Sequence, residues 1–231
     1  MAFLIRVALL AWIYQSVLSV VPLRSWEIQH NVRTKESSRA HIGSGFGLDA
    51  RLVPLDFFVM SKCPYAIACE QRLNDVLALV GEHVRVTPHY IANIDGYPTT
   101  CKHGESECLG DRQQLCVLKY AKFHAFWKFL MCQDKNVTSI GEPDTAEACL
   151  MELDASASVV SLVKSCYSSD EGDNALRNSA HKTSQLGVRG SCTVWIRGRE
   201  FPEDSSVEEY VSEICKPSGH VGSSSGCQLM R

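Results

Sequence analysis

Hydrophobic and polar residues follow one another in blocks that predict a mixed α/β domain over residues 51–215. Leu52–Met60 is a short, mostly apolar run of the kind that forms a buried strand. After Cys63 and Pro64, apolar residues recur at helical spacing, which predicts a helix that ends at Gly81. Val84–Ile91 is another apolar run and predicts a second strand.

The rest of the domain predicts a helical block, a small pair of strands and a last helix. The expected elements are, in order, a loop over 93–110, a helix over Asp111–Met131, two or three helices over 144–186, a strand over Cys192–Ile196, a turn at Arg197-Gly198, a strand at 200–201 and a helix ending near Cys215. Three of these helices have candidate caps, at Asp144, Asp173 and Ser205. This order of elements is that of a thioredoxin-like fold with a helical insertion.

Both ends of the chain differ in pattern from the domain between them. An apolar run over residues 7–21 follows Arg6. It is shorter than the roughly 20 residues that a membrane-spanning helix needs, and it predicts a signal peptide over 1–22, with an uncleaved signal anchor as the alternative. Residues 23–50 are polar and predict a flexible leader. Residues 216–231 are rich in Ser and Gly and predict a disordered tail.

Composition and one short motif, together with the apolar N-terminal run, predict that the chain is exported. Eleven cysteines are typical of a disulfide-stabilised domain in an oxidising compartment. Asn136-Val137-Thr138 is a glycosylation acceptor, which agrees with exposure to a secretory lumen. The net charge of −3 comes without a basic stripe, so nucleic acid is not an expected partner. An odd cysteine count leaves at least one unpaired within the chain, and Cys227 in the expected tail is a candidate.

Cys63 is the candidate nucleophile because a buried strand passes into a helix at this point. Pro64 suits the first helical position, where its missing N–H does no harm. The unpaired N–H groups and the positive dipole end of the helix then face the sulfur and favour the thiolate, which is the reactive form in disulfide exchange. Lys62 adds positive charge beside it. A plain structural half-cystine is the alternative.

The motif at this position is Cys63-Pro64-Tyr65-Ala66, which resembles the Cys-Pro-Tyr-Cys of glutaredoxins with its second cysteine replaced. Cys69 is the nearest substitute, but about 9 Å of helical rise separates it from Cys63. A disulfide needs Cα atoms about 4.4–6.8 Å apart. Cys69 therefore meets Cys63 only if the first turn opens, and otherwise packs in the core or pairs elsewhere.

A second group of residues is more specific. The segment 101–116 reads Cys-Lys-His-Gly-Glu-Ser-Glu-Cys-Leu-Gly-Asp-Arg-Gln-Gln-Leu-Cys. It resembles the signature of the interferon-γ-inducible lysosomal thiol reductase family, with six matching positions: Cys101, His103, Gly104, Glu107, Cys108 and Cys116. Lys102 and Asp111 depart from the pattern. The looser resemblance runs from about Leu55 to Cys215.

The resemblance implies a thioredoxin-like fold and the reduction of protein disulfides in acidic compartments, without a metal or another cofactor. Ala66 departs from the family's Cys-x-x-Cys and puts the ordinary dithiol cycle in doubt. We expect Cys101, Cys108 and Cys116 to be structural half-cystines, in a loop away from the active-site turn. His103 is then a hydrogen-bonding residue of that loop. A zinc site made of these four side chains is the alternative, although their spacing lacks the usual Cys-x₂₋₄-Cys pairs.

Cys192 is the candidate partner for Cys63. Thioredoxin folds usually place a cis-proline before the third strand, against the active-site sulfur. In register with Trp195, that position falls on Val194, and Cys192 lies in the same loop. We therefore expect Cys63 and Cys192 within disulfide reach, with a buried structural thiol at 192 as the alternative.

Two functions follow from these observations. The first is a thiol oxidoreductase of the secretory or endolysosomal lumen, in which Cys63 attacks a substrate disulfide and Cys192 or Cys69 resolves the mixed disulfide. Its partners are disulfide-bonded proteins and an external thiol reductant, with no membrane unless the N-terminal segment is an anchor. The alternative is a redox-inactive secreted binding protein on a reductase scaffold, which Ala66 favours.

Overall fold

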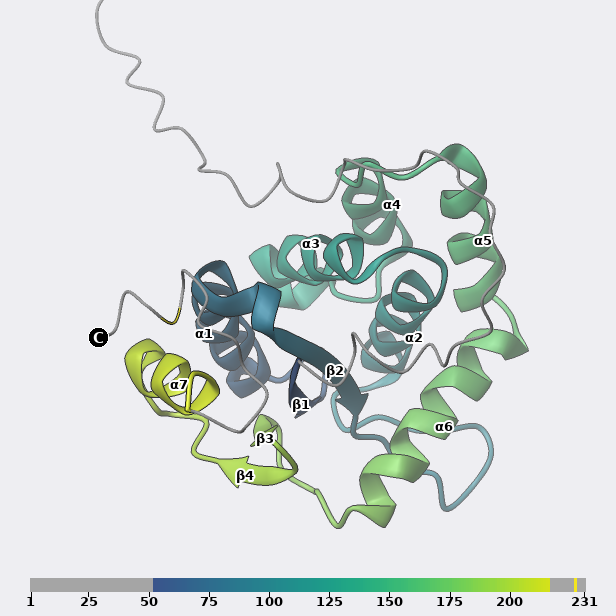
Figure 1. Cartoon of the computed structure of the whole chain (residues 1–231). Helices are drawn as coiled ribbons and strands as arrows, with labels where there is room; N and C mark the ends of the chain where they lie inside the picture. Colours follow the sequence, from purple (N-terminus) through teal and green to yellow (C-terminus); the bar gives the residue numbers. More distant parts are fainter. Residues whose placement is uncertain (1–51, 217–226, 228–231) are drawn as a thin grey trace, which may run out of the picture. The chain divides into compact units, whose positions relative to one another are not determined.

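The computed structural model describes residues 52–216 and residue 227. The signal peptide or anchor and the leader expected over 1–50 lie outside these residues, as does most of the expected tail. A four-stranded sheet with the order β2-β1-β3-β4 forms the centre of the domain (Figure 1). Its strands are β1 (Val53–Val59), β2 (Val84–Tyr90), β3 (Thr193–Ile196) and β4 (Arg199–Phe201).

Seven α-helices and two short 3₁₀ helices are described around this sheet. They are α1 (Pro64–Val80), η2 (Gly81–His83), α2 (Glu105–Tyr120), α3 (Phe123–Gln133), η3 (Asp134–Ser139), α4 (Pro143–Met151), α5 (Ala157–Tyr167), α6 (Asp170–Gln185) and α7 (Val207–Ile214). Helices α1 and α7 pack against each other, α2 contacts α3, α5 and α6, and α6 lies along β2 (Figure 1). The expected order of elements, with a helical insertion between β2 and β3, is confirmed.

Strand β1 is an inner strand of the sheet and pairs with a neighbouring strand on each side. It runs parallel to β2 and antiparallel to β3, so that Phe57 lies opposite Pro88 on one side and Val194 on the other. Leu55, Phe57 and Val59 are almost completely buried, which explains the apolar run in the sequence. Since parallel strands end at the same edge of a sheet, the residues after β1 and β2 share one edge with the start of β3.

The largest difference from the sequence-based expectation is in residues 93–131. Helix α2 begins at Glu105, inside the expected loop, and acidic residues in its first turn suit the positive end of the helix dipole. The single helix expected over Asp111–Met131 is divided, because Ala121 is extended with φ −113° and ψ 169°. This break lets α3 turn away from α2 and pack its aromatic residues on α1 and β1, where Trp127 donates to Asn74 and contacts Phe57.

The expected helix caps are wrong at three positions. Helix α4 starts at Pro143, two residues earlier than a cap at Asp144 requires, and Glu142 is its N-cap residue. Helix α6 is capped by Ser169 rather than Asp173, and α7 by Ser206 rather than Ser205. At α7 the capping box itself is present, one residue further along, and joins Ser206 to Glu209.

Five disulfides are described. Two of them join pairs of helices, and a third joins the end of α7 to Cys227. Cys116–Cys166 joins α2 to α5, Cys132–Cys149 joins α3 to α4, and Cys215–Cys227 closes the end of α7. The expectation that Cys227 is the unpaired cysteine is therefore wrong. Among the described residues, the unpaired cysteine is Cys63. No helix within residues 52–216 is long and apolar enough to cross a membrane.

Replacing both Cys116 and Cys166 by alanine should lower the free energy of unfolding by about 2–5 kcal/mol, because this disulfide constrains the unfolded chain and both residues are completely buried. Urea denaturation followed by circular dichroism measures the change. An unchanged denaturation midpoint would contradict a stabilising role for the disulfide.

Candidate active site

Cys63 lies at the start of α1, as the sequence predicts. It is the N-cap residue, with an extended backbone at φ −80° and ψ 124°, and Pro64 occupies the first helical position. Its side chain is only 5% exposed, whereas the neighbouring Tyr65 is 76% exposed. Ala66, at the usual place of a second cysteine, is completely buried. A free thiol thus sits beneath the surface at a helix N-terminus, beside an exposed aromatic ring.

The loop before β3 packs directly against this thiol. The Met60 backbone N–H donates to Ser191 Oγ at 3.1 Å, and Cys63 Sγ lies 4.0 Å from the Ser191 carbonyl oxygen. The peptide bond between Ser191 and Cys192 is cis. The expected placement of Val194 at the cis position is wrong, because Val194 lies inside β3, two residues further on. Ser191 carried no signal in the sequence, since a lone serine before a strand is unremarkable.

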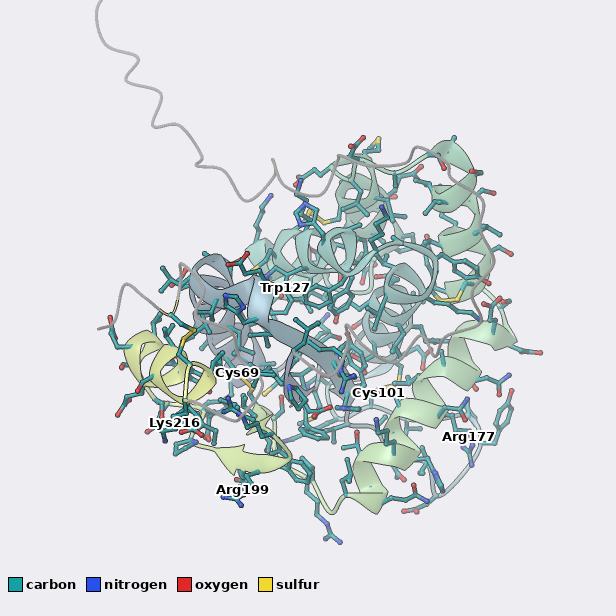
Figure 2. All side chains as sticks on the ribbon, viewed as in Figure 1. Cys69, Cys101, Trp127, Arg177, Arg199 and Lys216 are labelled. Atoms are coloured by element: carbon teal, nitrogen blue, oxygen red, sulfur yellow. A yellow bond between two sulfur atoms is a disulfide. The ribbon has the colours of Figure 1, made fainter. Side chains whose placement is uncertain are left out.

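Cys192 pairs with Cys69 and not with Cys63. The Cα atoms of Cys69 and Cys192 are 6.3 Å apart and their sulfurs are bonded. The disulfide expected between Cys63 and Cys192 is therefore not the one formed. Cys69 lies on the buried stripe of α1 (Figure 2), on the side that faces the loop before β3. All three candidate catalytic cysteines nevertheless meet at one place, where α1 and this loop come together.

Two buried carboxyl groups of α2 hold the turn that carries Cys63. Ser61 N–H donates to Asp111 Oδ1 at 3.1 Å, and Lys62 N–H donates to Glu107 Oε2 at 3.2 Å. Glu107 and Asp111 are one helical turn apart and completely buried. The family-like segment was expected to lie away from the active-site turn. That expectation is wrong, because α2 extends far enough to reach it.

Two glycines make this close approach possible. Gly104 begins α2 with φ +95°, a conformation that favours glycine. At Gly110 a side chain would meet Ile140 Cγ2 at 2.5 Å and Ser61 Oγ at 2.9 Å. Helix α2 can lie against the turn because Gly110 has no Cβ atom, whereas Gly104 provides the positive φ at which the helix begins.

The signature cysteines are all in disulfides. Cys101 pairs with Cys108, whereas Cys116 belongs to the pair with Cys166. Their sulfurs are therefore not free for the alternative zinc site, and no group of three or more potential metal ligands occurs among the described residues. His103 hydrogen-bonds to Glu107 through both its backbone N–H and Nδ1, which is the loop contact expected of it.

Lys62 is held by oxygen atoms on the far side of the turn. Its Nζ donates to Ser106 Oγ at 3.0 Å, to the Thr138 carbonyl at 2.9 Å and to the Ile140 carbonyl at 3.3 Å. These bonds connect the active-site turn to α2 and to the segment after α3. The expected effect of Lys62 on the Cys63 thiol stays a prediction.

A pair of buried acids lies beneath Cys63, and sequence reasoning missed it. Glu70 is two helical turns after Cys63 and 1% exposed, and the neighbouring Asp134 is 9% exposed. Neither carboxyl oxygen of Asp134 has a hydrogen-bond partner among the described residues. Burial, helped by Asp134, Asp111 and Cys63, raises the pKa of Glu70 well above its usual value. Burial raises the pKa of Asp134 to about 7, although the neighbouring Glu70 acts in the opposite direction. A glutamate on the apolar stripe of the helix was the available signal.

Two further buried groups that can titrate lie near Glu70 and Asp134. Asp111 comes from α2, and burial raises its pKa, while hydrogen bonds from Ser61 act in the opposite direction. Tyr90 comes from the end of β2, and burial together with these carboxyl groups raises its pKa. The chemistry that this arrangement allows is storage of protons close to the sulfur atoms.

The buried acids should make the protein more stable at mildly acidic than at neutral pH. A carboxyl group with a raised pKa keeps its proton in the folded state while the unfolded state loses it. Stability is then lost as pH rises from about 4 to about 7, by on the order of 2–4 kcal/mol for Asp134. Melting temperatures measured from pH 5 to 8 should fall, and less so in Glu70→Gln/Asp134→Asn.

Glu152→Gln is the matched control for this measurement, because Glu152 is exposed and pairs with Lys135 at the surface. It should leave the pH dependence unchanged. Equal pH dependence in the wild type and in the buried double variant would show that these acids do not govern it.

Comparison with known proteins places these features in context. The family model of "Gamma interferon inducible lysosomal thiol reductase (GILT)" matches residues 54–171, which is just over half of the chain. A curated relative from Arabidopsis thaliana, "Gamma-interferon-responsive lysosomal thiol protein", is 22% identical over 175 residues, covering 71% of this chain and 70% of its own.

Solved structures of bacterial proteins share the fold. DsbA from Mycobacterium tuberculosis is 15% identical with a TM-score of 0.55, over 77% of this chain and 87% of its own. MdbA from Corynebacterium diphtheriae, described as a thiol-disulfide oxidoreductase, is 16% identical with a TM-score of 0.53, over 73% and 86%. At such identities the likeness shows the fold alone, which is a thioredoxin-like α/β fold with a helical insertion.

Proposed function

Because the chain belongs to the gamma interferon inducible lysosomal thiol reductase family, we propose that it is a thiol oxidoreductase that reduces disulfides of protein substrates, with Cys63 as nucleophile. One observation carries the proposal: the free thiol of Cys63 lies at the N-terminus of α1, against the loop that contains Cys192. A thiol in this position can attack a substrate disulfide by thiol–disulfide exchange.

The reaction begins with the Cys69–Cys192 disulfide reduced by an external thiol. Cys63 attacks a substrate disulfide, so that a mixed disulfide forms and one substrate thiolate leaves and takes up a proton. Cys192 then attacks the sulfur of Cys63, which releases the second substrate thiol. Finally Cys69 attacks Cys192, and Cys63 is regenerated as a thiol. Two electrons pass to the substrate, and the protein ends in the disulfide state that the structure describes.

Cys192 is the better resolving residue because of its position. It directly follows Ser191, whose carbonyl oxygen is 4.0 Å from Cys63 Sγ. Cys69 is on the same helix as Cys63, about 9 Å further along its axis, and reaches that sulfur only through Cys192. The two segments therefore support a relay in the order Cys63, Cys192, Cys69.

The secretory or endolysosomal lumen is the compartment that best fits this protein. Five described disulfides suit an oxidising environment. Asn136 and Thr138 of the glycosylation acceptor are both exposed. The raised pKa of the buried acids also suits a compartment of mildly acidic pH.

A redox-inactive binding protein is the second candidate, and the buried Ala66 favours it. Without a cysteine at this position, the usual dithiol beside Cys63 is missing. The two candidates differ in whether Cys63 forms covalent intermediates with substrates.

Trapping of mixed disulfides separates the candidates. Cys192→Ser should accumulate substrates bound through Cys63, because the resolving thiol is lost, whereas Cys69→Ser should accumulate few. Non-reducing gel electrophoresis after incubation with native, disulfide-bonded insulin measures the adducts, and reduced and alkylated insulin is the control that lacks a disulfide. Cys63→Ser should give no adduct. If Cys69→Ser alone trapped as much substrate, the resolving residue would be Cys69 and not Cys192. No adduct in any variant would favour the binding protein.

Restoring a cysteine at position 66 should replace the relay. Ala66 and Cys63 are three residues apart at the start of α1, so Ala66→Cys creates a Cys-x-x-Cys pair. In the Cys192→Ser background it should recover insulin reduction. The added sulfur enters a packed site and should lower stability by about 1–3 kcal/mol, which a melting curve checks. A well-folded double variant without recovered activity would argue against Cys63 as the attacking residue.

A further inference from the structure

We infer that the Cys69–Cys192 disulfide decides which of two reactions Cys63 performs: exchange of disulfides within a substrate when the bond is formed, and net reduction when it is broken. The inference rests on the proposed function, since both reactions begin with attack by Cys63. The additional activity is that of a disulfide isomerase that works without a reductant.

The starting observation is that oxidation leaves the nucleophile intact. In a Cys-x-x-Cys site the attacking thiol is itself part of the disulfide once the site is oxidised. Here the partner position is Ala66, and the disulfide forms between Cys69 and Cys192 instead. Cys63 is the cysteine that stays free among the described residues. The oxidised protein therefore still carries a thiol at a helix N-terminus.

In this oxidised state the protein has no described thiol that can resolve a mixed disulfide. Cys63 attacks a substrate disulfide, one substrate thiolate leaves, and a bond forms between Cys63 and the other substrate sulfur. The sulfurs of Cys69 and Cys192 are bonded to each other and hold no thiolate. A thiolate of the substrate must then attack the mixed disulfide. A new substrate disulfide forms, Cys63 is released, and no electrons are gained or lost.

Reduction of the Cys69–Cys192 disulfide changes the outcome. Cys192 then carries a thiol one residue from the carbonyl that lies beside Cys63 Sγ. Its attack is intramolecular and competes with the substrate thiolate, because both thiols act at the same mixed disulfide. The substrate leaves with both of its sulfurs reduced. The supply of external thiol thus selects the reaction.

Wild-type protein in two redox states provides the test, with Cys63→Ser as the control. A ribonuclease with scrambled disulfides is incubated with the oxidised protein after all small thiols have been removed. Ribonuclease activity should return at least tenfold faster than without the protein, while the total thiol content stays constant. With a thiol reductant present, the protein should instead reduce insulin, and Cys63→Ser should do neither.

Two double variants sharpen the comparison. Cys69→Ser/Cys192→Ser should keep the isomerisation rate within about twofold and lose at least tenfold in catalysed insulin reduction. Cys132→Ser/Cys149→Ser removes a disulfide between α3 and α4 and should leave both reactions unchanged. Far-UV circular dichroism confirms that each variant is folded.

The outcomes separate this inference from the proposed function. If the oxidised wild type does not restore ribonuclease activity but reduces insulin with thiol present, the inference is wrong and the proposed function stands. If Cys63→Ser still reduces insulin, the proposed function fails as well. Isomerisation that requires Cys69 and Cys192 would also overturn the inference.

Discussion

Two hydrogen bonds from the turn before Cys63 to carboxyl groups of α2 are the constraint on which the site depends. They fix the backbone at Ser61 and Lys62, and therefore the direction in which α1 starts. Because Asp111 and Glu107 are buried, these bonds are shielded from water and fix the turn firmly. Without them the two N–H groups would be left without partners in the interior, which typically costs about 1–3 kcal/mol for each group.

The same constraint brings the insertion into the site. Helix α2 begins only four residues after Cys101, and the disulfide to Cys108 ties that start to its first turns. Lys62 reaches from the turn to the carbonyl groups of Thr138 and Ile140, beyond α3. The helical insertion is thus a structural support for the thiol and more than a cover on the sheet.

Much of the fold could be predicted from the sequence, because its strands and first helix depend on local pattern. The run at Leu52–Met60 and the Cys63-Pro64 start of α1 are both close to what the structure contains. The start of α2 at Glu105 could not be predicted. It directly follows Cys-Lys-His-Gly, which has the composition of a loop, and the helix is fixed by contacts with a turn that is distant in the sequence. The pairing of Cys192 also failed to follow from sequence, because Cys63 and Cys69 are both close to the same loop and only the direction of their side chains separates them.

The Cys69–Cys192 disulfide joins two residues that are 123 positions apart in the sequence, and the whole helical insertion lies between them. Closing so long a segment restricts the unfolded chain and contributes on the order of 4–5 kcal/mol in the chain-entropy description. Each round of substrate reduction would therefore also be a round of strengthening and weakening of the entire domain. In the proposed relay, the form that is ready to donate electrons would be the one more easily unfolded and digested, and the lifetime of the protein would be linked to how often it works.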